Sequence, residues 1–156
     1  MIRFYTALFM GKIARIAIKI LGKSGGTNYP GQLALKICPQ FLAYVGRPEK
    51  IIAITGTNGK TTTSNLLADI FEKNGYTLTT NRFGSNIDTG IATALLTGVT
   101  LGNKPKHKLA VLEVDERSSL KIYKYIKPDF VLCTNLLRDS LFRNPHPYFI
   151  FDIIEK

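Results

Sequence analysis

The sequence predicts an α/β protein with a mainly parallel sheet, entered after an N-terminal helical segment. Two observations carry this prediction. Four short apolar runs, rich in β-branched residues, alternate with segments of helical periodicity, which is the pattern of a buried parallel sheet. A glycine-rich loop also joins the first of these runs directly to a helix. We expect strands at residues 50–54, 76–80, 109–114 and 129–134, connected by right-handed crossovers.

We divide the chain into a basic segment, residues 1–47, and a domain, residues 48–156. The segment contains seven Lys or Arg and no Asp or Glu, whereas the rest of the chain contains fourteen basic and eleven acidic residues. Most of the net charge of +10 therefore lies at the N-terminus. Such a patch favours an acidic partner, and charge alone does not identify it.

The first part of this segment has the periodicity of an amphipathic helix. Lys12, Arg15, Lys19 and Lys23 recur at steps of three and four residues. On a helix they share one face, and the apolar residues lie largely elsewhere: Phe9, Ile13, Ala17, Ile20 and Leu21. The repeated charges argue against a membrane span. Two interpretations stay open, a helix packed on the rest of the protein or peripheral contact of residues 1–23 with an anionic membrane.

No nucleic-acid-binding motif accompanies the charge, so we expect no nucleic acid as a partner. A second helix is expected at residues 32–44, followed by a linker at residues 46–48. Cys38 and Cys133 lie far apart, without a CxxC pattern, which argues against a disulfide framework and against a zinc site in this stretch. We expect both to be buried in a protein of a reducing compartment.

The loop after the first strand has the composition of a phosphate-binding loop. It runs from Thr55 through Gly56-Thr57-Asn58-Gly59-Lys60-Thr61-Thr62, and a helical pattern follows. The glycines allow a tight bend in which backbone N–H groups face phosphate oxygens, and the helix N-terminus favours the same anion. We therefore expect ATP at Gly56, Thr57, Asn58, Gly59, Lys60, Thr61 and Thr62.

A magnesium site is expected beside this loop. The Thr61 hydroxyl follows the P-loop lysine and would be one ligand. Glu113 ends a buried strand, and ligands sit at the carboxyl ends of strands in open α/β sheets, so we expect Glu113 to be the charged ligand. Asp115 and Glu116 better fit acids that cap the following helix.

Arg138 and Asp139 are further candidates for phosphate or substrate contact, or for surface pairing. No Ser/His/Asp or Cys/His constellation is present, so hydrolysis by a protein nucleophile is not indicated and the catalytic residues stay unknown.

The loop is shorter than the general P-loop pattern, because Ile54 stands where that pattern has glycine. In this it resembles the ATP loop of the Mur ligases and folylpolyglutamate synthases. The MurT branch is also similar at Gly31-Gln32-Leu33-Ala34, Asn81-Arg82-Phe83-Gly84-Ser85-Asn86, Val111-Leu112-Glu113-Val114-Asp115-Glu116 and Cys133-Thr134-Asn135-Leu136-Leu137-Arg138-Asp139. The sequence departs from this branch at Phe83, where many relatives carry an acid, and at Ser140-Leu141-Phe142-Arg143, where a second acid is missing.

The resemblance implies the ATP-binding central domain of an amide-forming, carbon–nitrogen ligase of peptidoglycan synthesis. In the MurT branch the D-glutamate α-carboxyl of the lipid II stem peptide is amidated, with ammonia from a GatD-like glutaminase partner. The resemblance also implies ATP and Mg²⁺ as cofactors, with zinc only in a part that follows further downstream. It implies a location in the cytoplasm or at the inner face of the membrane. In the family the sheet has further strands, and a zinc ribbon and a ligase domain follow further along. We therefore expect residues 1–156 alone to be inactive. The alternatives are another Mur-type or folylpolyglutamate-type ligase and an inactive nucleotide-binding remnant.

Overall fold

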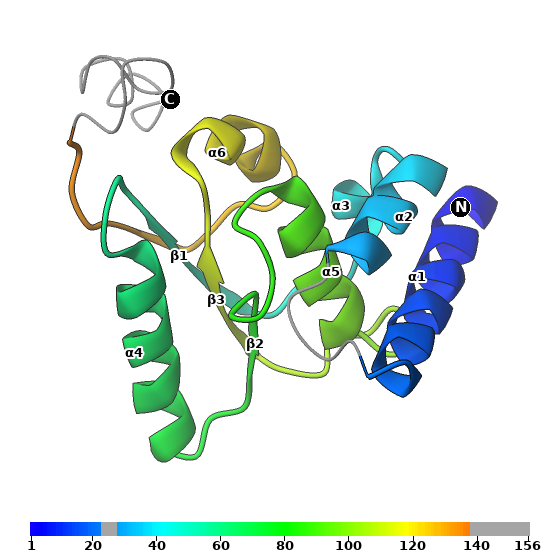
Figure 1. Ribbon diagram of the computed structural model, residues 1–156, viewed down its shortest axis with the longest axis horizontal. Coiled ribbons are helices and arrows are strands. Elements are labelled where there is room, and N and C mark those ends of the chain that lie inside the picture. The colour runs from blue at the N-terminus through cyan, green and yellow to red at the C-terminus, as the bar shows by residue number, and fades with distance from the viewer. Residues whose placement is uncertain (23–27, 138–156) are drawn as a thin grey trace.

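The computed structural model describes residues 1–22 and 28–137, and it contains a parallel sheet with helices on both faces (Figure 1). The strands are β1 (Lys50–Thr55), β2 (Leu78–Thr80), β3 (Leu109–Glu113) and β4 (Phe130–Cys133). They lie in the order β2-β3-β1-β4, and all three pairings are parallel. The helices are α1 (Ile2–Ile20), α2 (Tyr29–Ile37), α3 (Phe41–Tyr44), α4 (Lys60–Lys73), α5 (Asp88–Gly98) and α6 (Glu116–Tyr123). The prediction of a parallel α/β fold entered after N-terminal helices is confirmed.

The two faces of the sheet are covered by different helices. Helix α4 packs on β1, β2 and β3, while α5 and α6 contact each other on the opposite face, and α1 and α2 pack outside α5 (Figure 1). The strand residues follow this division, since Ala53, Ala110 and Leu112 belong to the core cluster that includes α5 and α6. Side chains alternate along a strand, so the neighbours of these residues within β1 and β3 face α4.

The expected helix at residues 32–44 is wrong in its extent, because the chain forms two helices there. Helix α2 begins at Tyr29, three residues earlier, with Pro30 in its first turn, where proline loses no helical hydrogen bond. It ends before Cys38, whose φ of −129° and ψ of 94° are extended. A residue that precedes proline is driven out of the helical region, and Pro39 therefore interrupts the helix.

The second strand is shorter than expected because its first residues terminate α4 instead. Gly75 adopts a φ of 83°, and the N–H of Tyr76 donates to the carbonyl of Phe71 (3.0 Å). The Tyr76 ring packs edge-on against Phe71, with centroids 5.6 Å apart. This is a glycine helix cap with its usual apolar contact, and it delays the strand to Leu78.

The N-terminal helices share one hydrophobic core with the sheet. Phe4 of α1 is buried and stacks on Phe41 of α3, with ring centroids 5.3 Å apart. The contact between α2 and α5 is closer still, since the N–H of Gly31 donates to Thr93 Oγ1 (2.9 Å). The boundary between residues 47 and 48 stays a prediction. Among the described helices, none combines the length and the hydropathy that crossing a membrane requires.

We predict that Gly31→Ala destabilises the fold by about 1–3 kcal/mol, the usual cost of overpacking. A Cβ at position 31 would lie 2.0 Å from the Thr89 carbonyl oxygen and 2.6 Å from Thr93 N, so α2 would have to move away from α5. The measurement is urea unfolding at equilibrium. Gly102→Ala is the matched control, because its nearest neighbour would be 3.9 Å away. An equal midpoint for both variants would contradict the close packing.

Candidate functional site

The loop between β1 and α4 lies where the chain leaves neighbouring strands in opposite directions. From β1 the chain continues to α4 on one face of the sheet, and from β3 it continues to α6 on the other (Figure 1). Ile54 at the end of β1 is in register with Glu113 at the end of β3. Such a divergence at the carboxyl ends of parallel strands is where open α/β sheets bind ligands.

The two loop glycines have different roles. Gly56 is buried with a φ of 120°, and a Cβ there would lie 2.4 Å from Thr134 Oγ1. Gly59 has a φ of 81°, and a Cβ there would meet nothing within 4 Å. Gly56 therefore allows the close approach of the segment after β4, whereas Gly59 turns the chain into α4 and leaves open space above the turn.

The segment after β4 fixes the shape of the loop. Asn135 binds both backbone groups of Asn58: its Oδ1 accepts from the N–H (3.0 Å) and its Nδ2 donates to the carbonyl (3.0 Å). The Asn135 carbonyl accepts from the N–H of Thr57 (2.8 Å), and Thr134 Oγ1 donates to the Asn58 carbonyl (2.7 Å). Leu137 completes the contact through the Thr57 hydroxyl. The N–H groups of Thr57 and Asn58 are thus engaged within the protein, and the expectation that these two residues bind ATP stays a prediction.

Helix α4 presents an N-terminus suited to an anion. It begins at Lys60 with Gly59 as its N-cap, without a side-chain cap and without an acidic residue in its first turn. Thr61 and Thr62 are exposed at this turn. The first N–H groups of a helix have no partner within the helix, and the helix dipole gives this end positive character.

Lys60 points back over the loop. Its Nζ donates to the carbonyls of Gly56 and Thr57 (3.0 Å to the latter) and lies 3.6 Å from Glu116 Oε1. The side chains of Lys60 and Glu116 are 13% and 4% exposed, so this ion pair is nearly buried. The ammonium is therefore held at the open turn by carbonyl oxygens and a carboxylate.

Glu116 lies elsewhere than its sequence position predicts. We expected it to cap a helix, but it is buried in the first turn of α6 and faces Lys60. Asp115 is the cap, since its Oδ1 accepts from the N–H groups of Arg117 (3.1 Å) and Ser118 (3.2 Å). Two adjacent acids after a strand that neighbours the loop were the available signal, because a helix needs only one of them as its N-cap.

Glu113 lies at the end of β3, as expected. Ala110 and Leu112 face α5 and α6, so the alternation of the strand turns Glu113 towards α4 and its N-terminus. Its Oε1 accepts from Asn86 Nδ2 (3.0 Å). Asn81 binds both backbone groups of Glu113, its Oδ1 accepting from the N–H (2.9 Å) and its Nδ2 donating to the carbonyl (2.8 Å). Asn81 and Asn86, both in the loop between β2 and α5, thus position this carboxylate.

The described residues contain no group of three or more His, Cys, Asp or Glu that could hold a metal ion by themselves. Mg²⁺ usually keeps several waters and is bound through one or two carboxylates together with phosphates. Glu113, in register with the end of the strand that leads into the loop, could supply such a carboxylate. Arg138 and Asp139 lie outside the described residues.

The expectation that both cysteines are buried is wrong for Cys133. Cys38 is buried, but Cys133 is exposed on β4, which lies at the edge of the four described strands. Partial burial raises the pKa of the Cys133 thiol, and the nearby Glu116 carboxylate adds to this effect.

The sequence model of the Mur ligase middle domain matches residues 54–141. The MurT subunit of lipid II isoglutaminyl synthase (glutamine-hydrolysing) from Staphylococcus aureus (strain COL) is 38% identical over 142 residues, which are 90% of this chain and 31% of that protein. The corresponding subunit from Streptococcus pneumoniae is 35% identical over 147 residues, 94% of this chain and 32% of its own. The chain thus spans about a third of the length of these curated relatives.

A UDP-N-acetylmuramoylalanine–D-glutamate ligase from Natranaerobius thermophilus is 60% identical over 61 residues, 38% of this chain and 13% of its own. Among solved structures, MurF from Acinetobacter baumannii aligns with a TM-score of 0.57 at 24% identity over 78% of this chain and 26% of its own. MurF from Thermotoga maritima, in complex with ADP, aligns with a TM-score of 0.57 at 21% identity over 80% of this chain and 28% of its own. At these identities the solved structures support the fold.

We predict that Asp115→Ala destabilises the protein by about 0.5–2 kcal/mol, the usual cost of removing a helix N-cap. The reason is the loss of the two hydrogen bonds from the first turn of α6. Thermal unfolding of Asp115→Ala and Asp115→Asn measures it, because asparagine caps as well as aspartate and should keep most of the stability. If Asp115→Asn loses as much stability as Asp115→Ala, capping is not the role of this residue.

Proposed function

Since the chain belongs to the Mur ligase family, through its middle domain, we propose that it binds ATP with Mg²⁺ as the nucleotide-binding part of an amide-forming ligase of peptidoglycan synthesis. The observation that carries the proposal is the Lys60 ammonium, held over an open turn at the uncapped N-terminus of α4. Two sources of positive potential converge there: the ammonium and the helix N-terminus, whose dipole ends in its first N–H groups. A polyphosphate is the ligand that such a place suits best.

The loop is preorganised for this ligand. The hydrogen bonds of Asn135 hold Thr57 and Asn58 in place, so the loop does not have to order itself on binding. Lys60 is held by carbonyl oxygens and by Glu116, and a phosphate would replace some of these partners. Glu116 remains close enough to orient the ammonium, which makes it a positioning residue in this proposal.

The Mg²⁺ ligands in this proposal are Thr61 and Glu113. The ion would neutralise charge on the phosphates and orient the terminal phosphate for transfer. Thr61 offers a neutral oxygen at the exposed first turn of α4. Glu113 offers a carboxylate that Asn86 already orients at one oxygen.

For the reaction, we propose amidation of the D-glutamate α-carboxyl of the lipid II stem peptide, with ammonia from a GatD-like glutaminase partner. The similarity to two MurT subunits over about nine-tenths of this chain supports it. These relatives are about three times as long, so the activity of the whole protein, its substrate and its partner are all part of the proposal.

A second candidate is ligation of an amino acid in place of ammonia. The 60% identity over 61 residues to a D-glutamate-adding ligase favours it. The two candidates share the nucleotide site and differ in the amine. Incubating the protein and its assembled partners with ATP and either lipid II and glutamine or UDP-N-acetylmuramoylalanine and D-glutamate separates them, and mass spectrometry of the acceptor is the readout.

We predict that Lys60→Ala weakens nucleotide binding about 10- to 150-fold, the equivalent of a charge-assisted contact of about 1.5–3 kcal/mol. Calorimetry with ATP and Mg²⁺ measures the affinity. Lys73→Ala is the control, because Lys73 is an exposed cation at the opposite end of the same helix. Equal affinities for Lys60→Ala and Lys73→Ala would contradict phosphate binding by Lys60.

The single variant also leaves Glu116 buried without its counter-ion, which destabilises a protein in its own right. The double variant Lys60→Ala/Glu116→Gln removes that charge. It should fold at least as stably as Lys60→Ala and still bind nucleotide weakly. If the double variant regains the parent's affinity, the loss in the single variant came from misfolding.

We predict that Glu113→Gln weakens nucleotide binding in Mg²⁺ and leaves binding in EDTA nearly unchanged. Removing a charged ligand lowers the affinity for the ion, and the amide still accepts from Asn86. A magnesium titration of nucleotide affinity gives the midpoint for each protein. Asp115→Asn is the control, since Asp115 caps α6 and should leave the midpoint in place. A shift for Asp115→Asn without one for Glu113→Gln would reverse the assignment.

A further inference from the structure

Helix α1 has two apolar faces, and only one of them is used in the fold. Phe4, Ala7, Leu8 and Gly11 are buried against α2, α3 and α5. A second set of large apolar residues points away from the protein and is 46–86% exposed: Ile2, Phe9, Ile13, Ile16 and Ile20. The helix packs on the rest of the protein as one interpretation expected, but the apolar residues expected on its packed side are exposed: Phe9, Ile13, Ala17, Ile20 and Leu21. This outer face needs a separate explanation.

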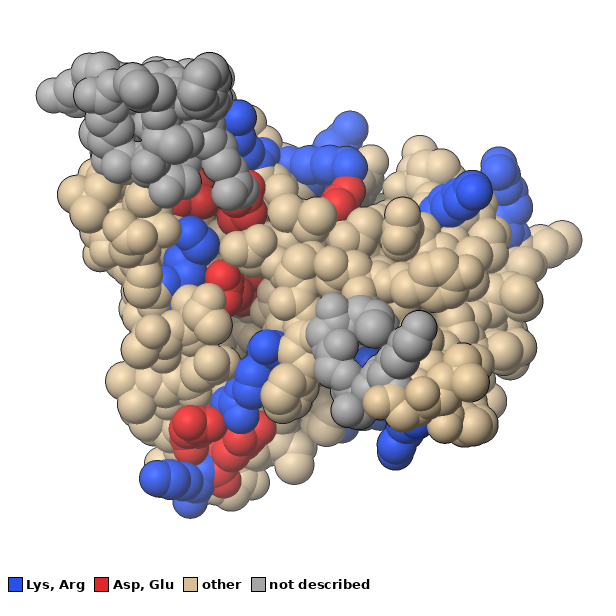
Figure 2. All heavy atoms as spheres, viewed as in Figure 1, with Lys and Arg blue, Asp and Glu red and all other residues tan. Residues whose placement is uncertain are grey.

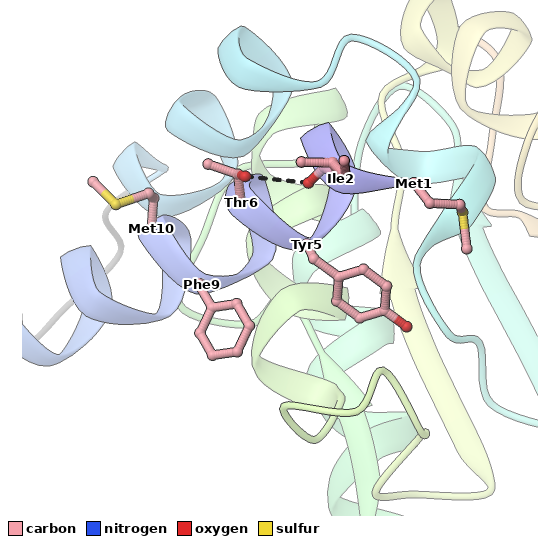
Figure 3. A pocket seen from close by; sticks show the side chains of 6 residues that line it. All are labelled: Met1, Ile2, Tyr5, Thr6, Phe9 and Met10. Atoms are coloured by element: carbon pink, nitrogen blue, oxygen red, sulfur yellow. Dashed lines mark hydrogen bonds between the residues drawn. The ribbon is translucent and has the colours of Figure 1, made fainter.

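The outer set forms a continuous stripe. Its members follow at intervals of seven, four, three and four residues, which keeps them on one side of a helix with 3.6 residues per turn. No Lys, Arg, Asp or Glu falls within the stripe, and α1 is about 28 Å long at 1.5 Å per residue. Figure 3 shows its N-terminal part, where Tyr5 and Phe9 project from successive turns on the same side of the helix. This is more contiguous apolar surface than single exposed residues on a monomer explain.

Cations lie along one edge of the stripe. Arg15, Lys19 and Lys106 are exposed and, with Lys12, line a pocket of about 250 Å³. Ile16 also lines this pocket, so the apolar stripe and the basic edge meet there. Lys12 is fixed in place, because its Nζ donates to the carbonyls of Leu96 (2.9 Å) and Val99 (2.7 Å) at the end of α5. Burial lowers the pKa of Lys12, and the nearby Lys106 ammonium adds to this effect.

The wider surface around α1 also carries positive charge. The first acidic residue of the sequence is Glu49, whereas seven Lys or Arg precede it. In Figure 2 the region of α1 and α2 shows blue atoms and no red ones, while the red atoms lie over the sheet, α4 and α6. An apolar stripe bordered by cations, on a segment of the sequence without acidic residues, complements anionic phospholipid, whose phosphates lie directly above its acyl chains.

We propose that α1 is an interfacial helix that rests on an anionic phospholipid membrane. The outer stripe lies in the boundary between headgroups and acyl chains, and Arg15, Lys19 and Lys106 face lipid phosphates. The helix does not cross the bilayer, in keeping with the lack of any spanning helix in the described part of the chain. Helix α1 and the nucleotide loop lie towards opposite ends of the longest axis of the molecule, so the loop stays open to solvent (Figure 1).

The test is sedimentation of the 156-residue protein with vesicles of phosphatidylcholine alone and of phosphatidylcholine mixed with phosphatidylglycerol. We expect binding to the mixed vesicles, little binding to the neutral ones, and a decrease with added salt. Ile13→Ser/Ile16→Ser and Arg15→Gln/Lys19→Gln should each weaken binding to mixed vesicles about tenfold or more.

Matched controls lie on the other side of the molecule. Leu66→Ser/Ile70→Ser removes exposed apolar residues from α4, and Lys73→Gln/Lys124→Gln removes two cations. Both controls should bind vesicles as the parent does. Thermal unfolding checks that the α1 variants are folded, and their nucleotide affinity should be unchanged, because the proposal does not depend on the nucleotide site.

Three outcomes would overturn the proposal. The first is equal binding to neutral and mixed vesicles, and the second is no difference between the α1 variants and their controls. The third is a concentration-dependent dimer in light scattering that Ile13→Ser/Ile16→Ser abolishes while vesicles do not sediment the parent. In that last case the stripe contacts a second copy of the chain.

Discussion

The site depends on the parallel pairing of β1 with both of its neighbours. Pairing with β3 puts Glu113 beside the end of β1, and pairing with β4 puts Thr134 and Asn135 against the loop that follows β1. Three segments distant in sequence therefore meet at one edge of the sheet. Because β4 supplies the contacts that shape the loop, the first strand and its glycines are not sufficient by themselves. Losing the register of β4 would remove the hydrogen bonds of Thr57 and Asn58 without changing a residue of the loop.

Positive charge at this edge is balanced inside the protein. An ammonium and a helix N-terminus close together repel each other unless anionic or carbonyl oxygen lies nearby. The carbonyls of Gly56 and Thr57, together with Glu116, supply that oxygen. A buried carboxylate that loses its partner costs several kcal/mol, roughly 3–5, so Lys60 and Glu116 constrain each other. This coupling explains how a cation can be kept ready beside an open turn.

The parts of the fold that could be predicted are those decided by neighbouring residues. β-Branched runs, the glycine loop and Asn74-Gly75 all act locally, and the four strands lie where their composition placed them. The errors arose where another local preference overrode the apolar periodicity. Pro39 interrupts the expected helix, and Tyr76 caps α4 instead of opening β2.

The candidate site was predicted less completely, because much of it depends on contacts distant in sequence. The pair Asp115 and Glu116 signals that one acid is not needed as a cap, but nothing in the sequence identifies Lys60 as its partner. Nothing near Asn135 indicates that its side chain binds Asn58. Such contacts follow from strand order, which composition does not specify. Cys133 illustrates the same point, since the four-residue apolar run of β4 suggests burial but β4 is the outermost of the described strands on its side of the sheet.

Helix α1 shows how small residues can separate two apolar faces on one helix. Ala7 and Gly11 let the inner face approach its neighbours closely: a Cβ on Gly11 would lie 3.2 Å from the Pro30 carbonyl oxygen. The large residues Ile2, Ile13 and Ile16 are then left for the outside. A helix that needed only one contact would gain stability and solubility from polar residues on its outer face. The sequence instead keeps isoleucine there and places its charges along the edge. This distribution matches a membrane surface, where apolar acyl chains lie beneath anionic phosphates.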